Sequence, residues 1–422
     1  MKKVSKKQSP GNLVRVPVIT SLAEVIRADL REFVVNAGMI ALRELLERDR
    51  SEVCGPRYEH NAERTARRAG HAPGELVMGG RRISVKRPRA RSLDGDEIAL
   101  PTWKEFSGAD PLNERALEQM LIGVSTRRYD RSLEPLGAGI ESRGTSRSAV
   151  SRRFVEVTEE QMNVWSKTDI SKIDLTALMI DGIVIAGHVL LVALGIDAGG
   201  TKHVLGVHEG ATENATSCKA LLGDLRDRGM RTDRSILIVI DGGKALASAV
   251  RSVFGSRAIV QRCQVHKMRN VLDHLPDAAR ESVRRAMQQA YATGDTKRAL
   301  TLLTNLERRL RKLHPGAAGS LAEGLDETLT ILQFKLPRSL ERTLATTNAI
   351  ENLNSSIRLL SGRVKRWRDG AMIERWTVTA LVDAAGRFRR LRGYEGMKTL
   401  NDALRARDQA AIKQVDSIKK VA

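Results

Sequence analysis

Two aspartates, Asp181 and Asp241, have surroundings that suit metal chemistry. Asp181 lies within an apolar run, Asp241 directly follows the apolar run 235–240, and a glycine follows each aspartate. If the two runs are neighbouring strands, the carboxylates meet although 60 residues separate them. Carboxylate oxygens suit Mg²⁺, and two such ions can serve phosphodiester chemistry. Each Asp-Gly pair could instead only cap a turn.

A cysteine and a histidine form a second candidate site. Cys263 and His266 have the C-x-x-H spacing of half a zinc site, but zinc takes four ligands and no second Cys/His pair is well placed. We therefore expect a structural or substrate-orienting pair and no structural zinc. The neighbouring Arg262, Lys267 and Arg269 suit contacts to phosphate.

The size and composition of the chain exclude several classes of protein. Its 422 residues suffice for two to three domains. Three widely spaced cysteines argue against a disulfide-rich scaffold, and 41% hydrophobic with 29% charged residues argue against wholesale disorder. The basic N-terminus lacks a signal peptide's apolar run, and Asp181 and His188 interrupt the apolar stretch 177–196. We expect a soluble, reduced, cytoplasmic protein with no membrane partner.

The charge of the chain indicates a partner rich in phosphates. Lys and Arg number 71 against 50 Asp and Glu, a net charge of +21. Residues 251–422 hold 33 basic and 17 acidic side chains, whereas residues 151–250 hold 11 and 13. Nucleic acid is the typical partner of such a basic region, because a surface that is merely solvated usually mixes both signs.

The N-terminal region is expected to be mainly helical, with a basic hairpin. Residues 1–12 form a basic arm that we expect to be disordered, and residues 20–50 have helical apolar spacing. Residues 75–89 predict a hairpin that turns at Gly79-Gly80 and has a basic second strand. The basic residues of that strand are equally consistent with contacts to phosphate and with an ordinary hairpin whose arginines are solvated.

A helix led by serine and arginine ends this region. Thr145 or Ser146 can cap a helix that presents Arg147 and Arg152 near its start. A short helix, a glycine-rich break and such a helix are the order of a helix-turn-helix, which would read DNA. A plain helical hairpin has the same order.

The middle of the chain changes to β periodicity. Three runs (175–185, 188–197 and 203–208) predict an antiparallel meander, followed by a helix (216–228), a strand (235–240), a helix (244–254) and a strand (258–261). This α/β order is that of the ribonuclease H-like fold, whose first strand lies centrally beside the fourth. Asp181 and Asp241 would then be neighbours. The residues from 264 onward are mainly helical in pattern.

Another enzyme class shares part of this pattern. Residues 194–202, Leu-Gly-Ile-Asp-Ala-Gly-Gly-Thr-Lys, resemble the first phosphate loop of sugar kinases in the actin-like ATPase superfamily. In those kinases the loop follows the first strand of its domain and a duplicated α/β domain follows. Here an earlier strand carries Asp181 and the later residues are helical and basic. Asp197 is therefore better explained by a hairpin turn, with the kinase as an alternative.

Longer motifs resemble those of the Mutator-type transposases of bacterial insertion sequences. They are Met179-Ile-Asp-Gly, Leu194-Gly-Ile-Asp-Ala-Gly-Gly-Thr-Lys-His-Val-Leu-Gly, Val239-Ile-Asp-Gly-Gly, Gln261-Arg-Cys-x-x-His-Lys-Met-Arg-Asn-Val-Leu, Thr346-Thr-Asn-Ala-Ile-Glu-Asn-Leu-Asn-Ser-Ser-Ile and Val364-Lys-Arg-Trp-Arg-Asp-Gly. The resemblance covers roughly residues 30–400. Jointly these motifs are highly specific.

The resemblance implies a DDE transposase, which cleaves DNA at the ends of its element and joins the freed 3′-hydroxyl to target DNA. Asp181, Asp241 and Glu351 would be its three acids and would hold Mg²⁺, with Mn²⁺ as a substitute and no nucleotide. Cys263 and His266 match the family's C-x-x-H signature. The expected partners are double-stranded DNA (terminal inverted repeats and target DNA) and further copies of the chain, on the bacterial nucleoid. A catalytically inactive DNA-binding derivative is a further alternative.

The third acid is the least certain from spacing alone, because Glu323, Asp326, Glu327 and Glu341 lie in the same region. Asn348 is a good N-cap, so Glu351 would fall in the first helical turn, where the helix dipole keeps it ionised. The same spacing is that of a capping box, in which the glutamate only reaches back to the cap amide. The family motif favours the metal ligand.

A tryptophan within a basic run is a candidate DNA contact. Lys365, Arg366 and Arg368 surround Trp367, which could stack on an unpaired base. A core tryptophan flanked by solvated arginines is the alternative.

These predictions divide the chain into six parts. They are a disordered arm (1–12), a mainly helical DNA-binding region (13–170), a ribonuclease H-like core with the first two acids (171–263), a helical insertion (264–345), a helical segment with the third acid (346–400) and a C-terminal tail (401–422).

Overall fold

The computed structural model describes residues 30–59, 64–108, 114–133, 136, 140–210 and 215–421. The chain forms two compact units, Met1–Val155 and Glu156–Ala422. The predicted arm 1–12 and residues 20–29 of the first predicted helix lie outside the described residues. Helix α5 (Arg147–Ser166) begins in the first unit and ends in the second.

The first unit packs a long helix on a hairpin. Its elements are α2 (Leu30–Cys54), β1 (Ala66–Met78), β2 (Arg81–Ser92), β3 (Glu97–Ile98), α3 (Pro101–Gly108), α4 (Glu114–Leu121), the 3-10 turn η1 (Asp130–Ser132) and β4 (Ser142–Arg143). Along α2, Val35, Met39, Leu42 and Leu46 recur at helical spacing and pack against the hairpin's Leu76 and its partners. The described part of this unit thus combines helices with a long hairpin.

The hairpin turns at Gly79 and Gly80, where the sequence predicts it. Both glycines have positive φ, as a tight hairpin turn requires. The strands are longer than predicted, because β1 already begins at Ala66 and continues past a bulge between Arg68 and His71.

The connection between α4 and α5 is longer than the turn of a helix-turn-helix. Residues 122–146 separate the two helices and include η1 and β4, whereas a helix-turn-helix joins its helices through three or four residues. Tyr129 of this connection packs against Val150 of α5. Ser146 caps α5 as expected, since its Oγ accepts the Ala149 amide at 3.2 Å.

A five-stranded mixed sheet forms the centre of the second unit. Its strands are β5 (Leu175–Ile185), β6 (His188–Asp197), β7 (Lys202–Gly210), β8 (Ile236–Ile240) and β9 (Ala258–Arg262), in the spatial order β7-β6-β5-β8-β9. The meander β5–β6–β7 is antiparallel, and β8 and β9 run parallel to β5. The predicted strand order and the contact of the first strand with the fourth are confirmed.

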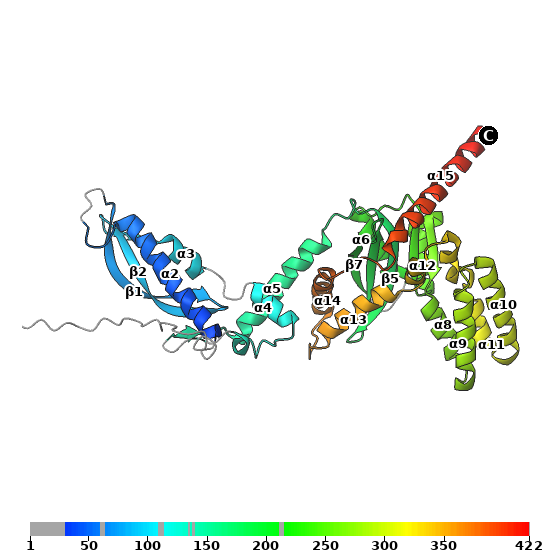
Figure 1. The fold of residues 1–422 in the computed structure, drawn as a ribbon, viewed down its shortest axis with the longest axis horizontal. Helices are drawn as coiled ribbons and strands as arrows, with labels where there is room; N and C mark the ends of the chain where they lie inside the picture. Colours follow the sequence, from blue (N-terminus) through cyan, green and yellow to red (C-terminus); the bar gives the residue numbers. More distant parts are fainter. Residues whose placement is uncertain are drawn as a thin grey trace, which may run out of the picture. The chain divides into compact units, whose positions relative to one another are not determined.

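Helices cover both faces of this sheet (Figure 1). Leu178 and Ile180 of β5 face α6 (Ala215–Asp227) and α7 (Lys244–Phe254) in one apolar core. Helix α13 (Asn348–Ser361) contacts β5 and β6, and α14 (Gly370–Ala385) contacts β7. Because side chains alternate along a strand, Asp181 points to the face opposite Ile180.

Helices make up the rest of the second unit. After β9 come α8 (Gln264–Asp273), α9 (Asp277–Tyr291), α10 (Thr296–Leu313), α11 (Pro315–Ala322), η3 (Asp326–Thr328), η4 (Thr330–Phe334) and α12 (Arg338–Leu344). Figure 1 shows α8–α11 grouped beside the sheet, as expected of an insertion. No helix among the described residues is apolar over a length that could cross a membrane.

The expected C-terminal tail is part of a long helix. After η5 (Tyr394–Gly396), α15 (Met397–Val421) runs without interruption through residues 401–421. Its Asp408 accepts from the Ser235 amide and hydroxyl and pairs with Arg257. These contacts fasten the helix to the sheet edge where β8 begins.

Candidate active site

The two aspartates predicted from the sequence lie on neighbouring parallel strands. Met179 pairs with Val239, so Asp181 and Asp241 are level two residues further along. Asp181 and Asp241 lie two residues after Met179 and Val239, and residues two apart on a strand face the same side of the sheet. Both aspartates therefore project toward α13. The Asp241 Oδ1 accepts the Gly243 amide at 2.9 Å, across a turn in which Gly242 has a φ of +101°.

Helix α13 places Glu351 on the same face. Thr347, not Asn348, occupies the N-cap position, so Glu351 is the fourth helical residue. The Thr347 hydroxyl donates to Glu351 Oε1 at 3.1 Å, while the Thr347 amide donates to Cys263 Sγ at 3.4 Å. With Thr347 as the N-cap, the third helical position is Ile350 and not Glu351, so the capping box considered above does not form.

The sulfur of Cys263 joins the starts of two helices. It accepts the His266 amide at 3.5 Å as the N-cap of α8 and the Thr347 amide at 3.4 Å at the start of α13, and the Thr347 hydroxyl lies 3.3 Å away. The Cys263 amide donates to the Ile240 carbonyl at the end of β8. A buried thiol therefore fixes α13 relative to the strand that precedes Asp241.

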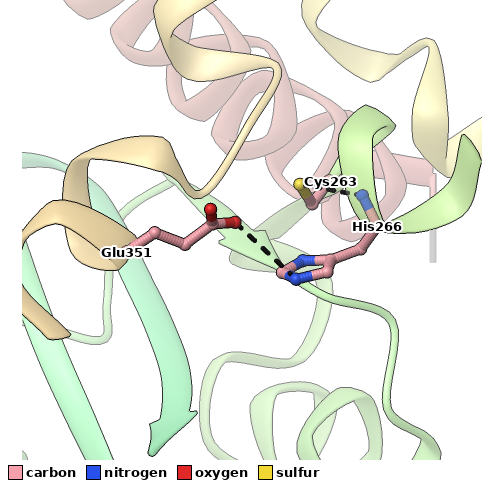
Figure 2. A group of neighbouring side chains, drawn as sticks. All are labelled: Cys263, His266 and Glu351. Carbon is pink, nitrogen blue, oxygen red and sulfur yellow. Dashed lines mark hydrogen bonds and ion pairs between the residues drawn. The ribbon is translucent and has the colours of Figure 1, made fainter. Parts of the chain in front are cut away.

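The His266 ring faces the Glu351 carboxylate, with Cys263 nearby (Figure 2). Its Nε2 is 3.6 Å from Glu351 Oε1, and its Nδ1 is 3.3 Å from the Thr347 hydroxyl. Its contact with Cys263 raises the pKa of His266 against the effect of burial, and the charges of Asp181 and Glu351 add to the rise. Burial alone would raise the pKa of Cys263, but contacts with His266 and Thr347 lower it.

A buried asparagine on α13 contacts the first acid. Asn354 is 2% exposed, and its Nδ2 donates to Asp181 Oδ2 at 3.0 Å. Burial raises the pKa of Asp181, and the negative charges of Asp241 and Glu351 raise it further against an opposing effect of His266. The three predicted acids are therefore close enough to interact electrostatically.

Thr347 and Asn354 are site residues to which the sequence analysis gave no role. Thr347 lies inside the T-N-x-I-E motif, and Asn354 lies one turn beyond Glu351 on the same side of the helix. Helical spacing could have identified Asn354, because residues three apart are neighbours on a helix surface.

Glu341 and Glu327, which were also considered for the third position, form ion pairs with arginines away from His266. Glu341 is buried and pairs with Arg338, and burial raises its pKa despite that partner. Glu327 pairs with Arg251 at 2.7 Å, and Asp326 is exposed. Of the acids weighed, Glu351 alone contacts His266 within the described residues.

Two of the three basic residues predicted to contact phosphate are buried. Arg262 donates to the carbonyls of Gly242 and Glu323, and Lys267 donates to the carbonyls of Ser320 and Glu323. Burial lowers the pKa of Lys267 to about 8. Their donors are used within the protein, which corrects that expectation, whereas Arg269 is exposed on α8.

The remaining predicted DNA contacts are solvent-accessible. Arg147 and Arg152 are exposed on α5. Trp367 is half-buried in the loop between α13 and α14, where Lys365, Arg366 and Arg368 are exposed. Trp367 is thus not a fully buried core residue.

Asp197 closes the turn between β6 and β7. Its carboxylate accepts the amides of Gly199 and Thr201 at 2.9 Å and contacts His203 at 2.8 Å. The loop amides that a sugar kinase would offer to phosphate are thus paired, and the described residues after β9 contain no strand.

Among the described residues, Cys263, His266 and Glu351 form a possible cation site, with ligand atoms within 4.8 Å of one another, and Asp181 and Asp241 are not part of that group. The two amide hydrogen bonds that Cys263 Sγ accepts suit a positioning role better than a metal ligand. Asp181, Asp241 and Glu351 instead offer only oxygen atoms, the donors that Mg²⁺ takes.

The fold and site define a mixed α/β protein in which acidic side chains lie on the face of the sheet that α13 covers. The sequence model of the family "Transposase, Mutator family" matches residues 18–390, so the chain belongs to the Mutator family of transposases, as the motifs indicated.

Insertion-sequence transposases are among its relatives. The transposase for insertion sequence element ISRM5 of Rhizobium meliloti (strain 1021) is 27% identical over 327 residues, covering 75% of this chain and 79% of the relative. That for IS6120 of Mycolicibacterium smegmatis is 31% identical over 246 residues (57% and 73%). That for IS256 in transposon Tn4001 of Staphylococcus aureus is 26% identical over 330 residues (75% and 80%).

Proposed function

We propose that the protein is a DDE transposase that binds the terminal inverted repeats of an insertion sequence, cleaves DNA there and joins the 3′-hydroxyl end to target DNA. The sheet and its helices would be a ribonuclease H-like core, and Asp181, Asp241 and Glu351 would hold two Mg²⁺ ions. Because two ends must be held together, we expect the protein to act as an oligomer on DNA.

The interaction of three carboxylates, on β5, directly after β8 and on α13, carries this proposal. Burial and the charges of Asp241 and Glu351 raise the pKa of Asp181, so a bound cation would relieve an unfavourable arrangement. The donor set fits Mg²⁺, because the three side chains supply only carboxylate oxygens. When bound, Mg²⁺ supplies the Lewis acidity that activates the attacking oxygen and stabilises the leaving oxygen.

The chain's own residues orient these acids. The Asn354 side chain donates a hydrogen bond to one oxygen of Asp181, and the Gly243 amide donates to one oxygen of Asp241. Thr347 donates to Glu351, and His266 contributes a nearby positive charge when protonated. Each acid therefore begins the reaction with a fixed orientation.

The reaction is two successive phosphoryl transfers. In the first, water attacks the phosphorus at the element end, and the 3′-oxygen of the element leaves and takes a proton. In the second, that 3′-hydroxyl loses its proton and attacks a target phosphorus, and the target's own 3′-oxygen leaves. No covalent enzyme intermediate forms.

A nicking assay tests the proposed function. Supercoiled DNA that carries the element's ends should be nicked in Mg²⁺ and stay intact in EDTA. Nicking that persists in EDTA, or DNA binding without nicking in either Mg²⁺ or Mn²⁺, contradicts a metal-dependent transposase. The second outcome is that of a catalytically inactive derivative.

Cys263→Ala is predicted to lower the cleavage rate by about 10- to 100-fold, because α13 loses its attachment to the end of β8 and small displacements in a site are costly. Cys263→Ser keeps an acceptor and should retain most of the activity. Two buried amides lose their acceptor in Cys263→Ala, so its melting temperature should also fall. Stoichiometric zinc that survives dialysis of the wild-type protein would contradict the positioning role.

Arg147→Ala with Arg152→Ala is predicted to reduce the preference for element ends over random DNA by at least about tenfold, the discrimination that lost base contacts cost. Arg127→Ala with Arg128→Ala removes the same charge from exposed residues outside α5 and is the matched control. Competition binding measures both. If both double variants weaken binding to the two DNAs equally, α5 does not read the ends.

A further inference from the structure

Arg262 lies where the sheet meets the end of the helical insertion. It ends β9 and is only 8% exposed. Its guanidinium donates through Nη2 to the Gly242 carbonyl and through Nη1 to the Glu323 carbonyl at 2.7 Å. One side chain therefore links the turn that follows Asp241 to the loop that follows α11.

Two glycines enclose this guanidinium. A Cβ on Gly242 would lie 2.2 Å from Arg262 Nε, and a Cβ on Gly324 would lie 2.2 Å from Arg262 Nη1. Both glycines have positive φ, +101° and +61°. The two loops approach the guanidinium so closely that neither position can hold a larger residue without displacing it.

The surrounding charges stabilise this buried cation. The carboxylates of Glu323 and Glu327 each lie 3.8 Å from it. Lys267 is buried beside it and donates to the same Glu323 carbonyl, but its contacts are with Ser320 and Glu323 and not with Gly242. Arg262 and Lys267 thus share the insertion loop, and of the two only Arg262 contacts the turn after Asp241.

We propose that Arg262 is a positioning residue for Asp241 and couples the end of the helical insertion to the acid cluster. The Gly242 carbonyl that Arg262 holds follows Asp241 directly, and the next amide, that of Gly243, donates to the Asp241 carboxylate. A shift of the insertion loop therefore moves the Asp241 oxygens. This inference rests on the proposed function, since it takes Asp241 as a cation ligand.

Arg262→Lys and Lys267→Met test the proposal as a matched pair. Mn²⁺ binding to the full-length protein without DNA is measured from the loss of the free-ion EPR signal, and Asp181→Asn identifies the binding that belongs to the acid cluster. Arg262→Lys keeps the charge but loses the planar fork, so its Mn²⁺ affinity should fall about tenfold, as for other residues that orient metal ligands. The Mg²⁺ concentration for half-maximal cleavage should rise by the same factor.

Lys267→Met loosens the same loop but should leave Mn²⁺ affinity within about twofold of wild type, whatever its melting temperature. Gly324→Ala, which displaces the guanidinium from the insertion side, should weaken Mn²⁺ binding as Arg262→Lys does. Unchanged Mn²⁺ affinity in Arg262→Lys, or an equal loss in Lys267→Met, overturns the proposal. A wild-type protein that neither binds Mn²⁺ at the acids nor cleaves DNA refutes the proposed function instead.

Discussion

Asp181→Asn is expected to abolish cleavage and yet to raise the melting temperature of the metal-free protein. Burial and two neighbouring acids raise the pKa of Asp181, so its ionised form destabilises the folded state at neutral pH, above the unfolded pKa of about 3.9. Asparagine removes the charge and can still accept from Asn354. We expect an increase of about 2–4 °C, which corresponds to roughly 1 kcal/mol in a domain of this size, and a cleavage rate lowered by more than about 1,000-fold.

Asp197→Asn, in the same sheet, is expected to change the melting temperature in the opposite direction. Burial alone would raise the pKa of Asp197, but His203 and the amides of Thr201 and Gly199 lower it. Its charge therefore stabilises the fold above the unfolded pKa, and that stabilisation is lost as the pH falls. At neutral pH Asp197→Asn should lower the melting temperature. Calorimetry of both variants in EDTA checks the pair, and a lower melting temperature in Asp181→Asn would show that its charge is not repelled.

Glu351→Gln is expected to fold and bind element ends normally but neither to cleave nor to join strands in Mg²⁺. The glutamine keeps the length of the side chain and an oxygen that accepts from Thr347, so the start of α13 is preserved. Only the negative charge that a cation needs is lost. Gel-shift titration and cleavage assays at equal protein concentration separate binding from chemistry.

Two other acids from the same region are the controls for Glu351. Asp326→Asn changes an exposed residue and should behave as wild type. Glu341→Gln neutralises a buried carboxyl whose pKa burial raises, and Arg338 is half exposed, so the variant should not lose stability at neutral pH and should still cleave. If Glu351→Gln cleaves at a near-normal rate while Glu341→Gln or Asp326→Asn is inactive, Glu351 is not the third metal ligand.

The sheet could be predicted from the sequence because its signals are local. Continuous apolar runs separated by glycine turns gave the strand order, and the register that follows makes Asp181 and Asp241 level. The helical course of residues 401–421 depends on a distant contact, that of Asp408 with Ser235, which no local pattern reveals. The early start of β1 was missed because residues 67–71 contain no large apolar side chain and none of them is buried.

The site was predictable only in part, for the same reason. Glu351 needed the family motif, since a capping box fits its local sequence equally well. The N-cap is Thr347 and not Asn348, and its amide donates to the sulfur of Cys263, 84 residues earlier in the chain. Arg262 and Lys267 belong to a basic motif that suggests DNA, but the carbonyl of Glu323 more than 50 residues later holds both inside the protein.

Strand joining from a pre-cleaved end tests the central claim most directly. A labelled duplex that ends in the element's terminal repeat with a free 3′-hydroxyl is incubated with the protein, Mg²⁺ and a target plasmid. We expect the label to become covalently attached to the plasmid through that 3′-oxygen, with no product from a 3′-deoxy end or from Glu351→Gln. Ends that never join, or ends that join equally well without the 3′-hydroxyl or without the Glu351 carboxylate, would contradict the account.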